Sequence, residues 1–564
     1  MSVNYLPQPS VLGEGLSLAD LPLAVTESGA LTADARVAGW ACVGPEGGYW
    51  PPQPSPTDEV GCPDARPTRL QGYFPDQAWS GDRPLRQVLD EDLVGPGRFY
   101  VPRSSATDSD PKPTRMVVAA SDAKDLRVSD STGDFLVIAA DDVSIEGITV
   151  ARHSPDWRTF ATRIAAGLSG ATLREVTVRD TASTPLKLAG TWREADGLVS
   201  ATVIDGVAVE RSGWLAAVIL YADDTAVTRS RFVGSDPWRE FAGGPQLGGI
   251  KVTKSHRLAI SGSDLKDNGG HGIWVDQSSY DVTIADSVIS GNTGSGVFFE
   301  ISHGLTLANN LILADGAGAG VRLAGASGVQ LVNNTVVGGA TNVAVLTDFR
   351  SQPFSPGRPC AEHPARYGQE AELHSCGIAY VSDFDRARSG EFGPGPNLTP
   401  GLNWYPHIEL MINNVLADSS GGRFCPSPTA LCVRGSTARG DQVTTVALKT
   451  VFTPDTVLDG NVYQGSGAVA ALLPGRDEPG EFEAARLPRL RGPDGLGSAH
   501  YDLIVERHGL AGAGFVDSSG APTNALIARQ GQARAVPQDE RLNAFVPAAS
   551  RRYGASAEVL NRSD

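Results

Sequence analysis

The chain has 564 residues, which is enough for a large core and for more than one domain. Its 47 basic and 64 acidic side chains give a net charge of −17. This excess of negative charge argues against a nucleic-acid partner, because a phosphate backbone would be repelled. No apolar run reaches the length of a membrane span. We therefore expect a soluble monomer without a transmembrane segment.

The first part of the chain, residues 1–130, is rich in proline and carries no repeat. Short apolar stretches around Trp79, Val88 and Phe99 predict β-strands. We expect a small β-rich domain that caps the open end of the repeats that follow, since an exposed terminal coil is a site of aggregation.

The six cysteines form three pairs that are close in sequence. They are Cys42 with Cys62, Cys360 with Cys376, and Cys425 with Cys432. An even number in loop settings favours disulfides and an extracellular or cell-envelope location, with free thiols as the alternative. No signal peptide is visible at the start of the sequence, and the export route stays open.

The segment from residue 131 to residue 463 is organised around a repeat of about one coil. Gly249, Gly272, Gly296 and Gly320 follow one another at steps of 23, 24 and 24 residues, and each opens a strand in which apolar residues alternate. A second short strand and a polar turn follow in each copy, with asparagines at corresponding corners such as Asn310 and Asn334. Clean alternation with a period of two excludes a helical repeat. The pattern resembles a right-handed parallel β-helix, an all-β solenoid.

The repeat is interrupted after Asn334, and the Asn-Asn turn returns 80 residues later at Asn414. One coil accounts for part of this distance, so we expect an insertion at about residues 349–405, which holds the second cysteine pair. A loop of this length is usually functional or disordered. Residues 464–564 are irregular, and we expect them to cover the C-terminal end or the side of the solenoid.

The alternation also predicts which side chains point away from the core. If Ile250, Val252 and their equivalents point inward, the second strand position presents a column outward on successive coils, and the fourth position presents another. The outward residues are Lys251, Trp274, Phe298 and Arg322 in the second position, and Thr253, Asp276, Glu300 and Ala324 in the fourth. Tyr221, from an earlier coil, is assigned to the same patch. Exposed aromatic rings beside charges are suited to stacking on a sugar ring.

Asp276 and Glu300 are the candidate catalytic pair. Neighbouring strands lie about 4.8 Å apart, close to the carboxyl separation of about 5–5.5 Å in retaining glycosidases. One carboxylate would be the nucleophile and the other the acid and base. The alternative is an ordinary acidic surface pair with Lys251 and Arg322 as neutralising neighbours.

Further substrate-binding candidates surround this pair. His303 lies three residues after Glu300, and Trp238 and Glu240 lie in the loop that precedes the strand of Lys251. We expect that loop to cover the patch. No metal site is predicted, and no Cys-x-x-Cys motif for zinc is present. Calcium would be expected only if the protein is a lyase.

The sequence Gly272-Ile273-Trp274-Val275-Asp276, followed one coil later by Phe298 to His303, resembles secreted bacterial β-helix proteins grouped with polysaccharide lyases and glycoside hydrolases. The order of motifs between Asp76 and Val101 similarly resembles the small domain that precedes the helix in such enzymes. The resemblance implies a polysaccharide or oligosaccharide substrate. Three hypotheses follow: a glycoside hydrolase using Asp276 and Glu300, a lyase with Lys251 or Arg322 as base, and a glycan-binding protein without catalysis.

Overall fold

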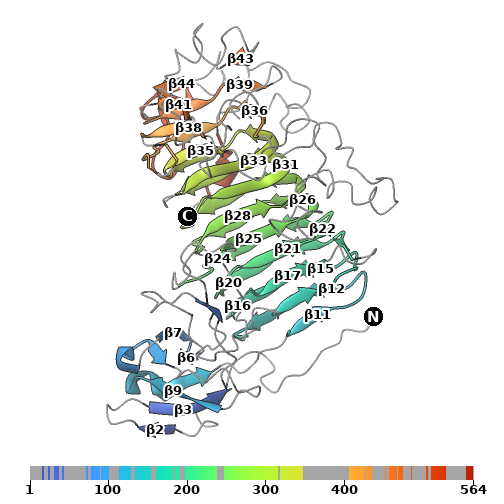
Figure 1. Cartoon of the computed structure of the whole chain (residues 1–564), viewed down its shortest axis with the longest axis vertical. Coiled ribbons are helices and arrows are strands. Elements are labelled where there is room, and N and C mark those ends of the chain that lie inside the picture. The colour runs from blue at the N-terminus through green and yellow to red at the C-terminus, as the bar shows by residue number, and fades with distance from the viewer. Residues whose placement is uncertain are drawn as a thin grey trace, which may run out of the picture.

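A computed structural model gives the fold of the chain (Figure 1). It describes residues 78–88, 91–100, 113–128, 134–153, 161–181, 184–190, 197–237, 247–277, 279–314, 318–346, 406–422, 424–425, 427–434, 451, 456–465, 510–528 and 554–562, together with isolated strands at 16–17, 23–25, 31–36, 41–42, 72–73, 468–473, 484–485 and 504–505. The predicted pairs Cys42–Cys62 and Cys360–Cys376 and the predicted insertion lie largely or wholly outside the described residues. The loop residues Trp238 and Glu240 lie outside them too.

The first described strands form a separate β-rich unit. Its mixed sheet follows the order β1-β10-β6-β7-β8-β9-β3-β2, and a two-stranded β4–β5 pair accompanies it. The strands are β1 (Leu16–Ser17), β2 (Leu23–Val25), β3 (Leu31–Arg36), β4 (Ala41–Cys42), β5 (Gly72–Tyr73), β6 (Ala78–Ser80), β7 (Arg83–Val88), β8 (Arg98–Tyr100), β9 (Pro113–Val118) and β10 (Leu126–Val128), with 3-10 helices η2 (Glu91–Leu93) and η3 (Ala120–Asp125). Figure 1 shows this unit next to the first coils of the solenoid.

From Leu136 onward the chain winds through three stacks of parallel strands. Sheet one contains β11 (Leu136–Ile138), β14 (Thr162–Ile164), β17 (Leu186–Ala189), β21 (Ala217–Leu220), β25 (Gly248–Thr253), β28 (His271–Asp276), the first halves of β31 (Val297–Ala308) and β33 (Ala319–Val332), then β35 (Thr341–Leu346), β38 (Thr429–Arg434) and β41 (Ala468–Leu473), with β42 (Ala484–Ala485) antiparallel at the end.

Sheet two lies on the far side of a corner from sheet one, and β31 and β33 run through both. Sheet two contains β12 (Ser144–Glu146), β15 (Thr172–Arg174), β19 (Val203–Asp205), β23 (Ala226–Thr228), β26 (His256–Ser261), β29 (Tyr280–Ala285), the second halves of β31 and β33, β36 (Ile408–Ile412), β39 (Val457–Asp459) and β43 (Ile504–Val505), with β18 (Val199–Ser200) and β22 (Ala222–Asp223) at the corner.

Sheet three completes each coil. Its 11 strands are β13 (Thr149–Ala151), β16 (Thr177–Thr181), β20 (Ala208–Ser212), β24 (Arg231–Val233), β27 (Asp264–Lys266), β30 (Val288–Ser290), β32 (Leu311–Ala314), β34 (Thr335–Gly338), β37 (Val415–Ala417), β40 (Val462–Gln464) and β44 (Leu510–Gly512). The pairings are parallel and in register from coil to coil, as in Thr149↔Thr177 and Thr177↔Ala208. The predicted parallel β-helix is therefore confirmed.

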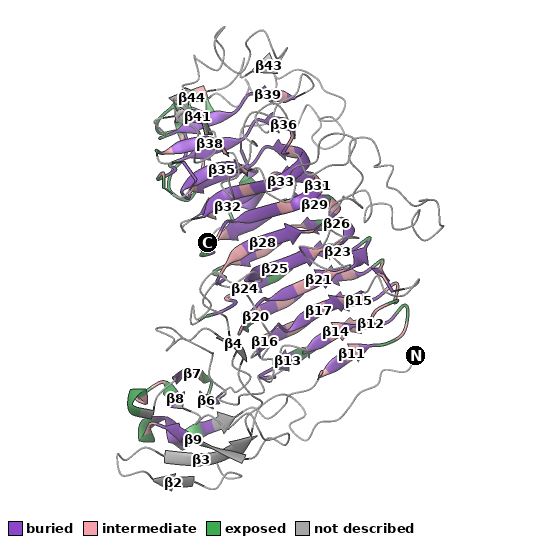
Figure 2. Cartoon of the chain, viewed as in Figure 1, coloured by how far each residue is buried: buried purple, intermediate pink, exposed green. Residues whose placement is uncertain are grey.

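The core fills the space between the three sheets, and most strand residues are buried (Figure 2). The inward positions predicted from the alternation are at most 1% exposed; they are Ile250, Val252, Ile273, Val275, Val297, Phe299, Val321 and Leu323. The stacked glycines have a steric reason. A Cβ on Gly249 would lie 2.6 Å from the carbonyl oxygen of Gly272, and one on Gly272 would lie 2.6 Å from that of Gly296.

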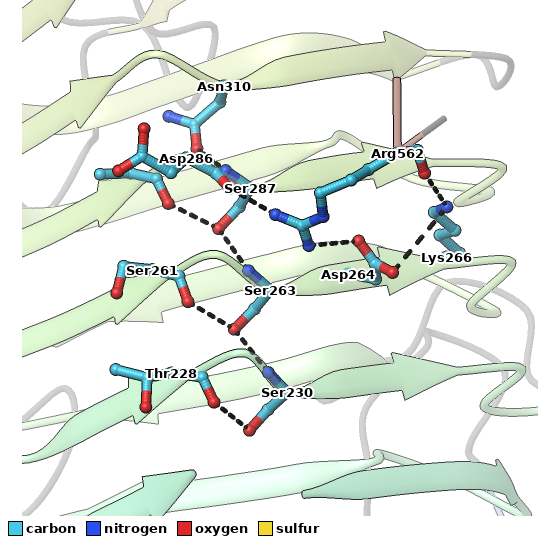
Figure 3. A network of polar contacts seen from close by, with 11 residues as sticks. Thr228, Ser230, Ser261, Ser263, Asp264, Lys266, Asp286, Ser287, Asn310 and Arg562 are labelled. Carbon is cyan, nitrogen blue, oxygen red and sulfur yellow. Dashed lines mark hydrogen bonds and ion pairs between the residues drawn. The ribbon is translucent and has the colours of Figure 1, made fainter. Parts of the chain in front are cut away.

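Polar ladders hold the corner between sheets two and three. Figure 3 shows Ser230, Ser263, Ser287 and Asn310 on successive coils, each backbone N–H donating to the side-chain oxygen of the next residue in the ladder at 3.0–3.2 Å. The ladder continues through side-chain amide bonds from Asn310 to Asn334, and onward to Asn414 and Asn461. Buried polar groups are thereby paired, as burial requires.

The described C-terminal residues lie along the outside of sheet three. Phe515, Val516 and Leu526 of the α6 region (Asn524–Ile527) pack against Val337, Val415 and Val462. Residues 554–562, which include α8 (Ala557–Leu560) and are called the C-terminal strap below, bury Val559 and Leu560 against Val288 and Leu311. Arg562 at the end of the strap donates to Asp264 at 2.6 Å and to the Asp286 carbonyl oxygen at 2.8 Å (Figure 3).

Candidate functional site

The outer column of sheet one is built as the alternation predicts. The register pairs Lys251 with Trp274, Trp274 with Phe298, and Phe298 with Arg322, so these four side chains lie on one face of four successive strands. The fourth strand position pairs Thr253 with Asp276 and, two coils further on, Glu300 with Ala324. The sequence therefore brought the right side chains to the same face.

The four residues of this column stack on one another along the solenoid axis. The Lys251 ammonium lies 3.2 Å from the centre of the Trp274 ring, and the Trp274 and Phe298 rings stack with centres 5.2 Å apart and an interplanar angle of 24°. The guanidinium carbon of Arg322 lies 4.0 Å from the Phe298 ring centre and 5.7 Å from that of Phe424. We call Lys251, Trp274, Phe298 and Arg322 the cation–ring stack. Cations over ring faces are mutually stabilising.

The stack corrects the expectation that these aromatic rings face solvent. Trp274 is 8% exposed and Phe298 2% exposed. One face of Trp274 is covered by Lys251 and the other by Phe298, while Arg322 covers the outer face of Phe298. A sugar ring therefore has no aromatic face to stack on here. The alternation gave the direction of each side chain, but it carries no information on what packs over them.

Neighbouring side chains close both ends of the stack. His271 contacts the Trp274 and Phe298 rings at 5.2 and 5.0 Å, and its Nδ1 accepts a 2.8 Å hydrogen bond from the Ser295 N–H. At the far end Phe424 is held by the predicted disulfide Cys425–Cys432, which is formed and fully buried. Cys432 continues the same column after Ala344, its partner in register.

The two candidate carboxylates are held by different donors. Asp276 Oδ2 accepts from the Lys251 ammonium at 2.6 Å, and its Oδ1 accepts from the Gln277 N–H at 2.7 Å. This ion pair is buried, with side-chain exposures of 6% for Lys251 and 9% for Asp276. Glu300 is half-buried, and its Oε2 accepts from the indole N–H of Trp274 at 2.9 Å. Glu300 is thus the more accessible carboxylate of the pair.

The structure places two other candidates away from the stack. Tyr221 lies one residue beyond the fourth strand position, because Leu220 is the partner of Thr253. It is a buried corner residue with a φ of 48°, and Lys254 lies over its ring at 5.2 Å. The assignment of Tyr221 to the outward patch was therefore wrong, because a left-handed residue ends the strand and turns the side chain away.

His303 lies on the corner between sheets one and two rather than in the stack. Its partners in register are Tyr280 and Ser327, and its Nδ1 lies 2.7 Å from the Ser327 hydroxyl. Burial lowers the pKa of His303 below its usual 6.5, and this effect exceeds the opposing influence of Glu409 and Asp281. A neutral imidazole at this position both donates and accepts hydrogen bonds.

The corner carries a second outward column, which the sequence analysis did not recognise. The register places Asp223, His256, Tyr280 and His303 one above another. Asp223 lies 2.9 Å from His256 Nδ1, and the His256 and Tyr280 rings lie 4.3 Å apart. Their spacing along the chain matches the coil length, which is the signal that would have identified them. We call these four residues the corner column.

Within the described ranges, no three His, Cys, Asp or Glu side chains converge in a way that would hold a metal ion. No helix among the described residues is long and apolar enough to cross a membrane.

Comparison with known proteins supports the same architecture. Residues 165–336 match the family described as right handed beta helix region. The chain contains a right-handed parallel β-helix. A search of the curated proteins found no match for this β-helix protein.

Among solved structures, the β-helix protein is similar to XylC in complex with xylose, at 12% identity over 49% of this chain and 52% of that one, with a TM-score of 0.39. It thus spans about half the length of XylC. The periplasmic alginate epimerase AlgG matches at 11% identity over 54% of this chain and 70% of that one, with a TM-score of 0.33. The A-module of the mannuronan C-5 epimerase AlgE6 of Azotobacter vinelandii matches at 11% over 66% and 90%, with a TM-score of 0.25. At these scores the likenesses assign no substrate.

Proposed function

We propose that this β-helix protein is a glycan-cleaving enzyme of the glycoside hydrolase type, with Glu300 as the group that transfers the proton. The observation that carries the proposal is the environment of Glu300. It is a half-buried carboxylate, oriented by the Trp274 indole N–H at 2.9 Å, on the coil next to a second carboxylate, Asp276. Two carboxylates on adjacent coils are the chemical requirement for glycoside hydrolysis.

The roles follow from how each carboxylate is held. Glu300 would protonate the glycosidic oxygen as the bond to the anomeric carbon breaks, and would then accept a proton from the attacking water. Asp276 would be the carboxylate that attacks the anomeric carbon. Its donors, the Lys251 ammonium and the Gln277 N–H, fix its orientation. Trp274 and Lys251 are therefore positioning residues in this scheme, and neither stacks on substrate.

The contacts of Lys251 disfavour the lyase alternative. A lysine that abstracts a proton needs a free lone pair on its nitrogen, whereas the Lys251 nitrogen contacts Asp276 at 2.6 Å and the Trp274 ring at 3.2 Å. Both contacts are favourable for an ammonium group and would be lost in a base. A calcium ion, which a lyase site would need, belongs to this alternative only.

A second candidate function is glycan binding without catalysis. It is favoured by the low exposure of the stack, since Lys251, Trp274, Phe298 and Asp276 are all under one tenth exposed. A buried, mutually satisfied stack can serve only to stiffen the face of the solenoid. The two candidates differ in one observable, which is turnover.

The proposed setting is outside the cytosol, as a monomer acting on a polysaccharide or oligosaccharide. The Cys425–Cys432 bond supports an oxidising compartment.

The test is a screen of the purified chain on a panel of neutral and acidic glycans, with release of reducing ends as the readout and Glu300→Gln as the matched control. Turnover that depends on Glu300, without unsaturated products, supports the hydrolase. Unsaturated products support the lyase, and binding without turnover supports the second candidate. Full activity of Glu300→Gln would contradict the mechanism.

A further inference from the structure

The corner column contains an aromatic ring that is partly accessible, unlike those of the stack. Among the tryptophan, tyrosine and phenylalanine side chains that the structure describes between residues 136 and 346, Tyr280 is the one that is not buried. Trp274 and Phe298, which were expected to face a sugar, have their faces covered. Stacking on a sugar needs an aromatic surface that solvent can reach, so Tyr280 meets the requirement that the stack does not.

The Tyr280 ring is held rigidly. Its hydroxyl accepts from Arg257 Nη1 at 3.2 Å, and the His256 ring packs against it at 4.3 Å with an interplanar angle of 41°. Arg257 is itself anchored, because Nε and Nη2 donate to the two oxygens of Asp224 at 2.7 and 3.1 Å and Nη2 also donates to Asp223 at 2.9 Å. A preorganised ring loses little conformational entropy when a ligand binds.

The polar groups around the ring indicate which sugar it would take. The Arg257 guanidinium is matched by two carboxylates, Asp223 and Asp224, and a third, Asp281, follows Tyr280 in the chain and is exposed. A uronate carboxylate would meet these like charges. A sugar hydroxyl, in contrast, can donate to Asp224, whose side chain is 51% exposed. The environment therefore favours a neutral sugar over an acidic one.

The corner also lies beside the proposed reaction centre. Tyr280 lies four residues after Asp276, and its partner in register, His303, lies three residues after Glu300 on the same strand β31. The corner column and the two carboxylates thus occupy the same two coils. A glycan bound at the corner would extend along the coil towards Glu300.

We propose that Tyr280, braced by Arg257 and Asp224, is the sugar-stacking platform of this protein and selects a neutral glycan. The assignment rests on the proposed glycan-directed function, but it concerns binding and does not require Glu300 to be catalytic.

The experiment measures binding of the full-length chain to soluble cellulose, xylan and mannan oligosaccharides and to oligogalacturonate. Three variants are compared with the wild type: Tyr280→Ala, Tyr280→Phe and Arg229→Ala. Arg229 is the matched control, since like Arg257 it has a left-handed backbone, with φ values of 49° and 54°, and pairs through two bonds with an aspartate one coil earlier. No aromatic contact with Arg229 is present among those the structure describes for that corner.

We expect a neutral oligosaccharide to bind, with affinity lowered about tenfold or more in Tyr280→Ala. Tyr280→Phe should keep the ring and lose only a few-fold, while Arg229→Ala should bind like the wild type. The tyrosine difference spectrum induced by the ligand should disappear in Tyr280→Phe, which provides a readout even if Tyr280→Ala folds poorly.

Three outcomes would overturn the assignment. They are unchanged affinity and an unchanged difference spectrum in the Tyr280 variants, a preference for oligogalacturonate, and no binding of any of these oligosaccharides by the wild type. Turnover that requires Glu300 but is indifferent to Tyr280 would leave the proposed function standing and remove only this inference. Binding that requires Tyr280, with no effect of Glu300→Gln on turnover, would do the reverse.

Discussion

At the scale of single residues, Trp274 links the two parts of the candidate site. Its ring lies between Lys251 and Phe298, and its N–H donates to Glu300. A residue that would be assigned to sugar stacking from its type and position instead orients a carboxylate and fills space. The distinction matters for mutagenesis, because the expected loss moves from substrate affinity to stability and to the orientation of Glu300.

Trp274→Ala should lower the free energy of unfolding by about 3–5 kcal/mol, because it removes a large buried side chain from a packed stack. Trp274→Phe keeps a ring between Lys251 and Phe298 but lacks the N–H, so it should lose less stability while still reducing turnover. Urea unfolding and activity assays on the same preparations measure both effects. A Trp274→Ala variant with wild-type stability would show that the stack is not packed as described.

The buried pair Lys251–Asp276 leads to a second prediction. Lys251→Met leaves a buried carboxylate without its ammonium and should cost about 3–5 kcal/mol. The double variant Lys251→Met with Asp276→Leu should be more stable than that single variant, because no buried charge remains unpaired. Exposed Arg229, as Arg229→Ala, should leave the unfolding midpoint nearly unchanged. A double variant less stable than Lys251→Met would contradict this view of the pair.

His303 gives a prediction for pH. Since burial holds its pKa below the usual 6.5, the unfolded chain binds more protons than the folded chain between those two values. The contribution of the neutral imidazole to stability is therefore complete above about pH 6.5 and is lost as the pH falls below it. His303→Gln should flatten this part of the stability profile. Unfolding curves between neutral and mildly acidic pH, compared for the two proteins, provide the check.

At the scale of secondary structure, the strands and their register could be predicted because two physical rules suffice. Alternation fixes which side chains enter the core, and the glycine spacing fixes which residues stack, as Gly249 and Gly272 do. Burial of the outer face could not be predicted in this way. It depends on residues distant in sequence, such as Phe424 against Arg322, and no periodicity relates the two.

The corner residues show the same limit. The strand of Tyr221 ends with a left-handed backbone at that residue, as happens at Lys254 and Gln277 on the following coils. Asparagine and glycine announce such bends in a sequence, but tyrosine, lysine and glutamine do not. The corner column was overlooked for this reason, although its members recur at the coil spacing.

The C-terminal strap provides a prediction at this scale. Its nine residues contact coils that are far earlier in the chain, through Val559 and Leu560 and through Arg562 with Asp264. Each fully buried valine or leucine contributes about 1.5–3 kcal/mol. Deleting residues 554–564 should therefore lower stability measurably and expose Val288 and Leu311, which binding of a hydrophobic dye would detect. Arg562→Ala should have a smaller effect. Equal stability of the truncated chain would show that the strap is not docked.

At the scale of the whole molecule, the solenoid is a rigid frame that sets the distance between functional groups. Coils repeat the same backbone path, so any residue type placed at one position is matched one coil later. Asp276 and Glu300 are brought near each other by this repetition, as are Tyr280 and His303. The frame could be inferred from the sequence, whereas the choice among hydrolase, lyase and binding protein depends on chemistry at a few side chains.

The central claim is that Glu300 transfers the proton in glycan cleavage, and turnover by Glu300→Gln is its most direct test. The isosteric amide retains the contact surface with Trp274 but cannot donate a carboxyl proton. On a glycan that the wild type cleaves, we predict that the rate falls by about a hundredfold or more, with an unchanged unfolding midpoint. Cleavage at the wild-type rate would contradict the account.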